Sequence, residues 1–501
     1  MAIKRSCGIL MPISSLPSPY GIGTLGKEAY AFVDFLAKAG QSWWQMLPVG
    51  PTSYGDSPYQ SFSAYAGNPY FVDLTVLLED GLVTRAELDA MDWGSDPAKV
   101  AYEKIYLSRF VLLQKATERG WKRDEKAVAA FAKENAAWLD NYVLFMALKR
   151  RFGMVAWTEW PDEDIRLHRP AAVERYRKEL AEDIRLFTYI QYLFYRQWDA
   201  LRAYAHSKGV GIIGDMPIYV AMDSADVWAE PGSFQLDEKN VPTEVSGCPP
   251  DSFSADGQLW GNPLYNWDVM KRDGYGWWIR RIAGAARLYD ILRIDHFRGL
   301  ESYWAVPYGE PTAKNGRWVK GPGMDLMSVL IGWFPNLQFI AEDLGFLTPE
   351  VHQLLKDSGL PGMKVLEFAF DSREPSNYLP HTSERNCVCY AGTHDNPPIL
   401  LWKDDADAAD IDMAVRYLGL NEAEGFHWGV LRGGMSSVAD LFVAQMQDYL
   451  GLGAGARMNV PGILGGNWQW RMKPGQLDDA LAKKLADMAR IYGRSDRAWQ
   501  A

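Results

Sequence analysis

Short apolar runs that end in an acidic residue recur along the chain. The runs cover residues 210–214, 289–294, 337–341 and 387–393. They lead into Asp215, Asp295, Glu342 and, one residue beyond His394, Asp395. Nearly continuous apolar runs of this length predict strands that are buried on both faces, as in a parallel sheet. In a parallel α/β barrel the C-terminal ends of the strands share one face, where active sites lie, so we expect these acids to meet there.

Strand and helix patterns alternate over most of the chain. The patterns predict further strands at 8–11, 42–47, 70–74, 363–370 and 456–460. They predict helices at 25–40, 277–288, 348–358, 404–418, 434–451 and 478–493. This alternation favours an α/β fold, a (β/α)8 TIM barrel, over a sandwich. A plain barrel takes about 250 residues, which leaves roughly half of the chain as insertions.

Two segments are candidates for those insertions. Residues 75–208 are rich in Ala, Glu, Lys, Arg and Leu at helical spacing, which predicts a mainly helical insertion with one long helix from 171 to 207. Residues 221–275 are rich in Trp, Pro, Gly and Asp and predict a loop-rich insertion over the active-site face. No linker separates independent domains, so residues 1–501 are predicted to form a single catalytic barrel.

The composition narrows the range of possible functions. The net charge of −11 and the pI near 5.3 argue against nucleic-acid binding, which calls for a basic face. The chain has 21 Trp, 25 Tyr and 20 Phe, many of them among Gly, Pro, Asn and Asp in predicted loops. Aromatic side chains in polar loops can stack on sugar rings. Some of these side chains have the simpler role of anchoring the loops to the barrel. The long loop 48–69 is of this kind, and such loops are more often functional than idle.

Cysteines and the N-terminus bear on location. Cys387 and Cys389 lie two apart on a predicted strand and would point to the same face, which is poor disulfide geometry. No cysteine spacing suggests zinc. The sequence contains neither a signal-peptide pattern nor an apolar run of transmembrane length. A cytoplasmic protein without membrane contact is therefore expected.

The acids suggest glycoside chemistry. They are separated by 80, 47 and 53 residues, which fits neighbouring or next-neighbouring strands when one β/α unit takes about 30 residues. Two carboxylates about 5 Å apart are the parts of a retaining glycoside reaction. Arg293 lies two residues before Asp295 on the same strand face, where it would keep Asp295 ionised and oriented.

Two other interpretations of the acids stay open at this point. Any single acid of this kind is more often a buried structural carboxylate. The main chemical alternative is a metal site, whose candidate ligands are Asp295, His296, Glu342, Asp343, His394 and Asp395. However, Asp295 and His296 are adjacent and would point to opposite faces if both lay on the strand, which disfavours a metal.

Several motifs together identify a family resemblance. They are DSPYQ at 56–60, GDMPI at 214–218, GNPLY at 261–265, RIDHFRG at 293–299, AEDLG at 341–345, GTHDN at 392–396 and RMN at 457–459. On these motifs the chain resembles, over nearly its whole length, the 4-α-glucanotransferases called amylomaltases or disproportionating enzymes, relatives of the α-amylases. The resemblance implies a barrel without a separate C-terminal β-domain. One departure is Ile463, where a hydroxyl-bearing residue is expected.

The resemblance also implies roles for individual residues. It makes Asp295 the nucleophile, Glu342 the general acid/base and Asp395 the third acid, which grips sugar hydroxyls. The residues that it implies for substrate binding are Arg293, His394, Tyr59, Trp260, Asp371, Asn459 and Tyr54. No metal and no cofactor is expected.

The function implied is transfer of α-1,4-glucan segments between maltooligosaccharide or starch-like chains by a retaining double displacement. An α-amylase-type retaining hydrolase is the alternative, and a non-catalytic glucan-binding protein is a second alternative of another class. The expected partners are donor and acceptor α-1,4-glucans, with no nucleic acid and no membrane, and the oligomeric state is left open.

Overall fold

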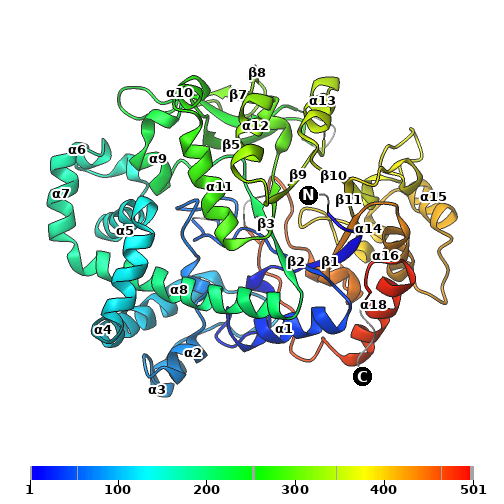
Figure 1. Cartoon of the computed structure of the whole chain (residues 1–501), viewed down its shortest axis with the longest axis horizontal. Coiled ribbons are helices and arrows are strands. Elements are labelled where there is room, and N and C mark those ends of the chain that lie inside the picture. The colour runs from blue at the N-terminus through cyan, green and yellow to red at the C-terminus, as the bar shows by residue number, and fades with distance from the viewer. Residues whose placement is uncertain (1–2, 54, 251–253, 346, 464, 497–501) are drawn as a thin grey trace.

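A parallel barrel forms the centre of the molecule. The computed structural model describes residues 3–53, 55–250, 254–345, 347–463 and 465–496. Within these ranges eight parallel strands lie in the spatial order β10-β11-β12-β1-β2-β3-β6-β9 (Figure 1). The backbone N–H of Ala341 at the end of β9 donates to the carbonyl oxygen of Pro361 before β10, which brings the two outer strands of that order together. The predicted (β/α)8 fold is confirmed.

The barrel strands are short and deeply buried. They are β1 (Ser6–Leu10), β2 (Trp43–Gln45), β3 (Gly211–Met216), β6 (Ile291–Ile294), β9 (Gln338–Ala341), β10 (Gly362–Val365), β11 (Cys387–Tyr390) and β12 (Leu441–Gln445). Every residue of β6, β11 and β12 is buried. This burial on both faces explains why the strands appear in the sequence as continuous apolar runs.

Helices surround the barrel. They include α1 (Lys27–Lys38), α8 (Ala181–Ser207), α11 (Gly276–Leu288), α12 (Met324–Trp333), α13 (Pro349–Ser358), α14 (Ile399–Asp405), α15 (Ala408–Leu418), α16 (Phe426–Ser436) and α18 (Asp479–Ile491). In α1 the buried residues Ala29, Phe32, Val33 and Leu36 recur every three to four positions and form one apolar stripe. The chain leaves this helix at Gly40, whose φ of 68° suits glycine.

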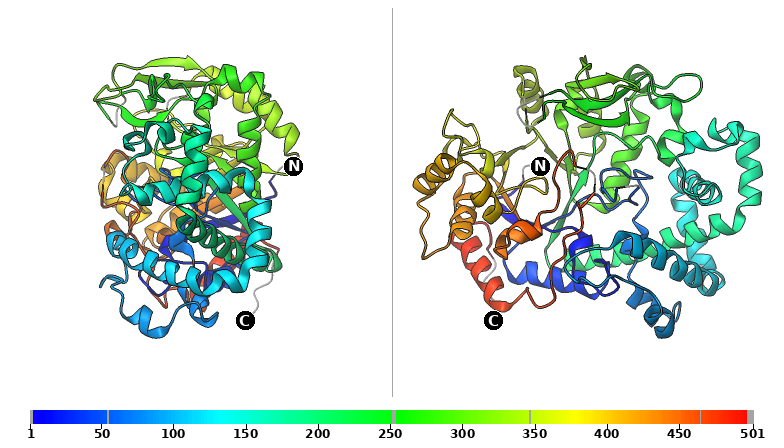
Figure 2. Two further views of the ribbon diagram at one scale, coloured as in Figure 1. Left: turned by 90° about the vertical axis from the view of Figure 1, so that its left-hand side faces the viewer. Right: turned by 180° about the vertical axis from the view of Figure 1, so that it is seen from behind.

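A helical layer lies on one side of the barrel, at the left of Figure 1 and the right of the rear view in Figure 2. It contains α2 (Leu74–Glu79), α3 (Arg85–Asp89), α4 (Tyr102–Glu134), α5 (Ala136–Arg151), α6 (Glu163–Arg166) and α7 (Pro170–Glu179). The single helix expected from 171 to 207 is wrong, because the chain breaks at Leu180 between α7 and α8. Helix α8 packs against β3 and α1 and so belongs to the barrel's own ring. The division of the chain into subdomains stays a prediction.

The strand expected at 70–74 is also wrong. This stretch is the 3₁₀ helix η2 (Pro69–Phe71) followed by the start of α2. The side chain of Asn68 accepts a hydrogen bond from the backbone N–H of Tyr70, and that of Asp73 accepts one from Val76. These two caps favour helical turns over an extended chain.

A small antiparallel sheet lies beside the barrel and was not predicted. Its order is β5 (Gln258–Pro263), β4 (Glu244–Cys248), β7 (Ser302–Pro307) and β8 (Arg317–Lys320). Two of these strands, with α9 (Ala225–Ala229) and α10 (Trp267–Arg272), lie within 221–275, which was expected to be mainly loop. Strand β4 pairs with β7, which lies some fifty residues further along the chain, so the local sequence does not reveal the partner.

Three assignments in the last third of the chain need correction. The helix expected at 434–451 contains the barrel strand β12, between α16 and α17 (Met446–Tyr449). The strand expected at 456–460 is absent from the described residues, which there follow the 3₁₀ helix η8 (Ala454–Ala456) without joining the sheet. Strand β10 also ends earlier than expected, at Val365, where the 3₁₀ helix η6 (Leu366–Phe368) begins. Four apolar residues, Leu441 to Ala444, between two helical segments carry no period that distinguishes strand from helix.

Among the described residues, none of the helices is both long enough and apolar enough to cross a membrane.

Candidate active site

Asp295 and Glu342 follow neighbouring strands in register. Ile294, the last residue of β6, lies opposite Ala341, the last residue of β9. The next residue on each strand is therefore the acid, and the backbone N–H of Glu342 donates to the carbonyl oxygen of Ile294 at 3.0 Å. Neighbouring strands lie about 4.8 Å apart, so this register places the two acids side by side at the barrel mouth.

Arg293 joins Asp295 to a third carboxylate. Its Nη1 donates to both oxygens of Asp215 at 2.7 Å and to Oδ1 of Asp295 at 3.0 Å. The Arg293 side chain is 3% exposed and that of Asp215 is fully buried. The register pairs Asp215 on β3 with Arg293 on β6, so adjacent strands deliver both partners. The predicted contact between Arg293 and Asp295 is present, whereas the part played by Asp215 was missed.

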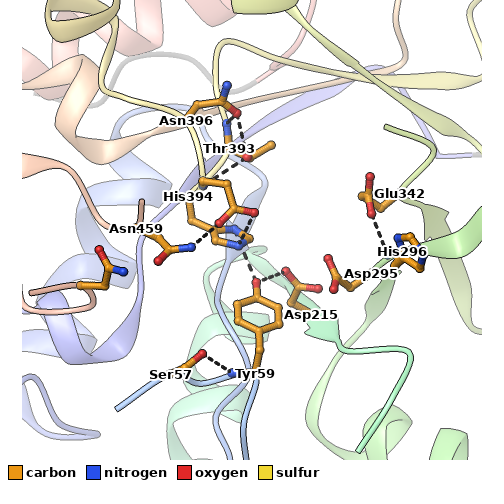
Figure 3. A network of polar contacts seen from close by, with 12 residues as sticks. Ser57, Tyr59, Asp215, Asp295, His296, Glu342, Thr393, His394, Asn396 and Asn459 are labelled. Carbon is orange, nitrogen blue, oxygen red and sulfur yellow. Dashed lines mark hydrogen bonds and ion pairs between the residues drawn. The ribbon is translucent and has the colours of Figure 1, made fainter. Parts of the chain in front are cut away.

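Tyr59 links this group to the far side of the mouth. Its hydroxyl donates to Oδ2 of Asp215 at 2.8 Å and lies 3.5 Å from Nδ1 of His394. The rings of Tyr59 and His394 stack with centroids 5.1 Å apart. Figure 3 shows Tyr59 between His394 and Asp215, with Asp295 beyond. A chain of contacts thus runs across the mouth from β6 to the loop after β11.

Asp395 lies on that loop and is held from several directions. Nδ2 of Asn459 donates to its Oδ1 at 2.6 Å, and Nε2 of His394 lies 3.4 Å from its Oδ2. Nη2 of Arg457 donates to its backbone carbonyl at 3.1 Å. The Asp395 side chain is 44% exposed, which leaves it accessible to a ligand.

The turn beneath Asp395 is closed by its neighbours. Oδ1 of Asn396 accepts hydrogen bonds from the backbone N–H and from the hydroxyl of Thr393, at 3.0 and 2.9 Å. Oγ1 of Thr393 in turn accepts from the backbone N–H of Asp395 at 3.3 Å. Because these bonds fix the turn, the direction of the Asp395 side chain is set by residues on both sides of it.

Glu342 is held by backbone groups. Its Oε2 accepts from the N–H of His296 at 2.6 Å, and its Oε1 accepts from the N–H of Leu344 at 2.8 Å. His296 adopts a left-handed conformation with φ 52°, so it has already left the strand. The Trp260 ring meets the His296 imidazole edge-on with centroids 4.7 Å apart. Trp260 on β5 therefore lies close to the residue that holds Glu342.

Burial shifts the pKa values of the acids and of the histidines at the mouth in opposite directions. Burial raises the pKa of both Asp295 and Glu342, and the positive charge of Arg293 acts in the opposite direction on both. Two buried carboxyl groups side by side therefore retain one shared proton at a higher pH than a single carboxyl group in water does. Burial lowers the pKa of His394, and it lowers that of His296 to about 3, so both imidazoles are neutral at pH 7.

Not every predicted substrate residue lies in this network. Both carboxylate oxygens of Asp371 bind Arg373 at 2.8 Å, and this pairing lowers the pKa of Asp371 to about 2. Asp371 lies six residues beyond the end of β10 rather than at its end, and its role stays a prediction. Tyr54 lies outside the described residues. Ile463 is 59% exposed.

Some residues of the network have no role assigned from the sequence. Asp215 is expected at the mouth because it ends an apolar run in the same way as the other acids, but its contact with Arg293 is not. Arg457, Thr393 and Asn396 act through backbone or through one another, and no local pattern reveals this. Within the described part of the chain, no three His, Cys, Asp or Glu side chains converge as a metal site requires.

Comparisons with known proteins agree with this arrangement. A family model described as 4-alpha-glucanotransferase matches residues 11–478. The 4-alpha-glucanotransferase of Clostridium butyricum is 48% identical over 488 residues, covering 97% of this chain and 100% of that protein. The 4-alpha-glucanotransferase of Thermus thermophilus is 47% identical over 99% of this chain and 100% of its own length.

The structure also has a close likeness among solved proteins. The amylomaltase from Streptococcus agalactiae, solved in complex with acarbose, superposes with a TM-score of 0.96 at 42% identity. The match covers 98% of this chain and 100% of that one. The likeness therefore extends over the barrel, its helical layer and the mouth.

Proposed function

The chain belongs to the 4-α-glucanotransferase family, and from this premise we propose that Asp295, Glu342 and Asp395 transfer α-1,4-glucan segments by a retaining double displacement. The family's enzymes act on α-1,4-glucans, and so does this one. The observation that carries the assignment of roles is the register that sets Asp295 beside Glu342, because retaining enzymes keep their two carboxyl groups about 5–5.5 Å apart.

In the first step Asp295 attacks the anomeric carbon of the donor glucan. The bond between that carbon and the glycosidic oxygen breaks while a β-linked ester forms on Asp295. Glu342 gives its proton to the departing oxygen, which leaves as the 4-hydroxyl of the shortened chain. Arg293 supports this step because its contact with Asp295 favours the ionised carboxylate, the form that is nucleophilic.

In the second step the 4-hydroxyl of an acceptor glucan attacks the ester. Glu342, now ionised, takes the proton of that hydroxyl, and the ester bond to Asp295 breaks. A new α-1,4 bond forms, so both carboxyl groups return to their starting states. Two inversions at one carbon give net retention.

The third acid acts on the sugar rather than on the bond that breaks. Asp395, accessible at the mouth and oriented by Asn459, is placed to accept hydrogen bonds from ring hydroxyls. Its negative charge also stabilises the positive charge that develops on the ring in the transition state. Neutral His394, stacked on Tyr59, offers a flat surface and a polar edge beside it.

Transfer requires that an acceptor sugar, and not water, reaches the ester. Trp260 supports this requirement because its ring packs on His296, whose N–H holds Glu342. An aromatic side chain at that point provides a stacking surface for the acceptor and removes room for water. Tyr59, Tyr54 and Asp371 stay predicted substrate contacts. A cytoplasmic location also stays a prediction, and the oligomeric state is open.

Incubation with maltotriose alone tests transfer against hydrolysis. We expect glucose together with a ladder of glucans longer than maltotriose. Shortening to maltose and glucose without longer products would favour the amylase-type hydrolase instead.

Two substitutions test the roles of the acids. Asp295→Asn should be inactive on maltotriose and on α-maltosyl fluoride. Glu342→Gln should lose activity on maltotriose but still release fluoride, because fluoride leaves without a proton. Fluoride release by Asp295→Asn at the wild-type rate would refute the nucleophile assignment.

A further inference from the structure

A second pair of acids lies beneath the mouth and has no part in the mechanism described above. Glu367 follows β10, in η6, and Asp448 follows β12, in α17. These are the two strands that flank β11, which carries the loop with Asp395. Glu367 is 8% exposed and Asp448 is 1% exposed. The two buried carboxyl groups therefore bracket the Asp395 loop from both sides.

Each member of the pair touches one end of that loop. The backbone N–H of Glu367 donates to the carbonyl oxygen of Ala391 at 3.2 Å. A methyl group added to Gly392 would lie only 2.8 Å from Oε1 of Glu367, so the carboxyl group packs directly on the loop backbone. At the other end, Oδ1 of Asp448 accepts the backbone N–H of Ile399 at 2.8 Å.

The carboxyl group of Glu367 is buried with little polar compensation. Neither of its oxygens has a hydrogen-bond partner of good geometry among the described residues, and neither has Oδ2 of Asp448. Arg457 is the nearby cation, but its Nη2 and Nε already donate to the carbonyl oxygens of Asp395 and Asn459. An ionised carboxylate in such a place is strongly disfavoured, and a bound proton removes that penalty.

We propose that Glu367 is held as a neutral carboxylic acid and acts, with Asp448, as a positioning residue for the loop that carries Asp395. The inference rests on the proposed role of Asp395. Glu367 reaches that residue through Asn396, whose side chain lies close to Glu367 and closes the turn by accepting from Thr393.

The charges around Glu367 agree with this state. Burial raises the pKa of Glu367 well above its usual value, the carboxyl group of Asp448 raises it further, and Asn396 and Arg457 lower it. Burial also raises the pKa of Asp448, to about 7. A proton on Glu367 removes the repulsion between the two acids and leaves an O–H donor under the turn.

Two substitutions of Glu367 separate charge from shape. Glu367→Gln keeps the volume and a donor without charge, so we expect kcat for maltotriose disproportionation within about twofold of wild type. Glu367→Met keeps the volume but removes the polar end, so the turn shifts and kcat falls by about 10- to 100-fold, as misplacement of a catalytic group by about 1 Å does. If Glu367→Gln is as impaired as Glu367→Met, the carboxylate charge is needed and the proposal fails.

A matched control separates positioning from stability. Asp73 is also buried, but its side chain caps α2 in the helical layer and accepts a hydrogen bond from the hydroxyl of Thr24. Asp73→Ala should lower the melting temperature while keeping the kcat of the folded enzyme. If Glu367→Met also keeps its kcat, Glu367 is structural only and the proposal is overturned.

Infrared difference spectra test the protonation state without relying on activity. Wild type minus Glu367→Gln at pH 7 should show the C=O stretch of a protonated carboxyl group. Carboxylate bands in its place would overturn the proposal even if Glu367→Met does not fold. Asp395→Asn tests the premise separately: full activity in that variant would remove the proposed role of Asp395 but leave the infrared result standing.

Discussion

Replacement of Arg293 by Met tests the electrostatic support of the nucleophile. One nitrogen, Nη1, contacts three carboxylate oxygens, two on Asp215 and one on Asp295. Arg293→Met keeps most of the apolar stem and removes the charge. It leaves Asp215 and Asp295 facing each other across a site in which Asp215 is fully buried.

The size of the effect follows from the burial. Removal of one partner from a buried ion pair costs about 3–5 kcal/mol. Coulomb's law gives about 5.5 kcal/mol for unit charges 3 Å apart at an effective dielectric constant of about 20, close to the upper end of that range. If this loss destabilises the ionised form of Asp295, kcat/KM at neutral pH drops by about 10²- to 10⁴-fold, since each 1.36 kcal/mol is a factor of ten.

The pH profile gives the sign of the effect. The Arg293 charge acts against the rise that burial produces in the pKa of Asp295. Without Arg293 the pKa of Asp295 rises further, so the nucleophile becomes ionised only at higher pH. The acid limb of the kcat/KM profile, which reports the free enzyme, should therefore move to higher pH.

The assay is the initial rate of glucose release from maltotriose across the pH range in which each variant stays folded. Arg281→Met is the matched control, because Arg281 is also buried but its guanidinium donates to backbone carbonyls such as those of Pro217 and Ile218. That variant should lose stability without moving the acid limb. An acid limb that stays in place in folded Arg293→Met would refute the reasoning.

Three further outcomes are expected. Asn459→Ala removes the 2.6 Å donor to Asp395. Because a hydrogen bond to a charged group contributes about 1.5–3 kcal/mol, kcat/KM for maltotriose should fall by about 10- to 100-fold. An unchanged kcat/KM would contradict the role of Asn459. Trp260→Ala should lower the ratio of longer glucans to new reducing ends in maltotriose digests, with Trp260→Phe between it and wild type. Gly214→Ala places a methyl group about 2.1 Å from the Tyr289 ring and should lower the free energy of unfolding by about 1–3 kcal/mol, measured by urea denaturation.

The barrel strands that carry the acids could be predicted because burial on both faces requires a continuous run of apolar residues. A strand buried on both faces must be apolar throughout, and it can become polar only where it reaches the mouth. β6 and β9 follow this pattern apart from Arg293 in β6 and Gln338 at the start of β9, and Asp295 and Glu342 follow their last residues. β12 follows the pattern too, with four apolar residues before Gln445, but helix-like residues on both sides make this short run hard to recognise.

Contacts between distant segments could not be predicted in the same way. The small antiparallel sheet depends on pairing of β4 with β7, and neither strand has a distinct pattern alone. The role of Asp215 depends on one arginine nitrogen shared with Asp295, which sequence spacing does not encode. For such residues only the fold brings the partners together.

The same contacts decide which of the two central acids carries the proton. Asp295 contacts a full positive charge directly, at 3.0 Å, whereas the hydrogen bonds of the Glu342 carboxyl group among the described residues come from two backbone N–H groups, and the Arg293 charge acts on it without such a bond. A whole charge favours an ionised neighbour more strongly than amide dipoles do, so the shared proton belongs on Glu342. A carboxyl group has about four lone-pair sites, and the N–H groups of His296 and Leu344 occupy two of them. Glu342 can therefore stay anchored while it holds a proton toward the glycosidic oxygen, and the proposed roles of nucleophile and acid follow from unequal neighbours rather than from the acids themselves.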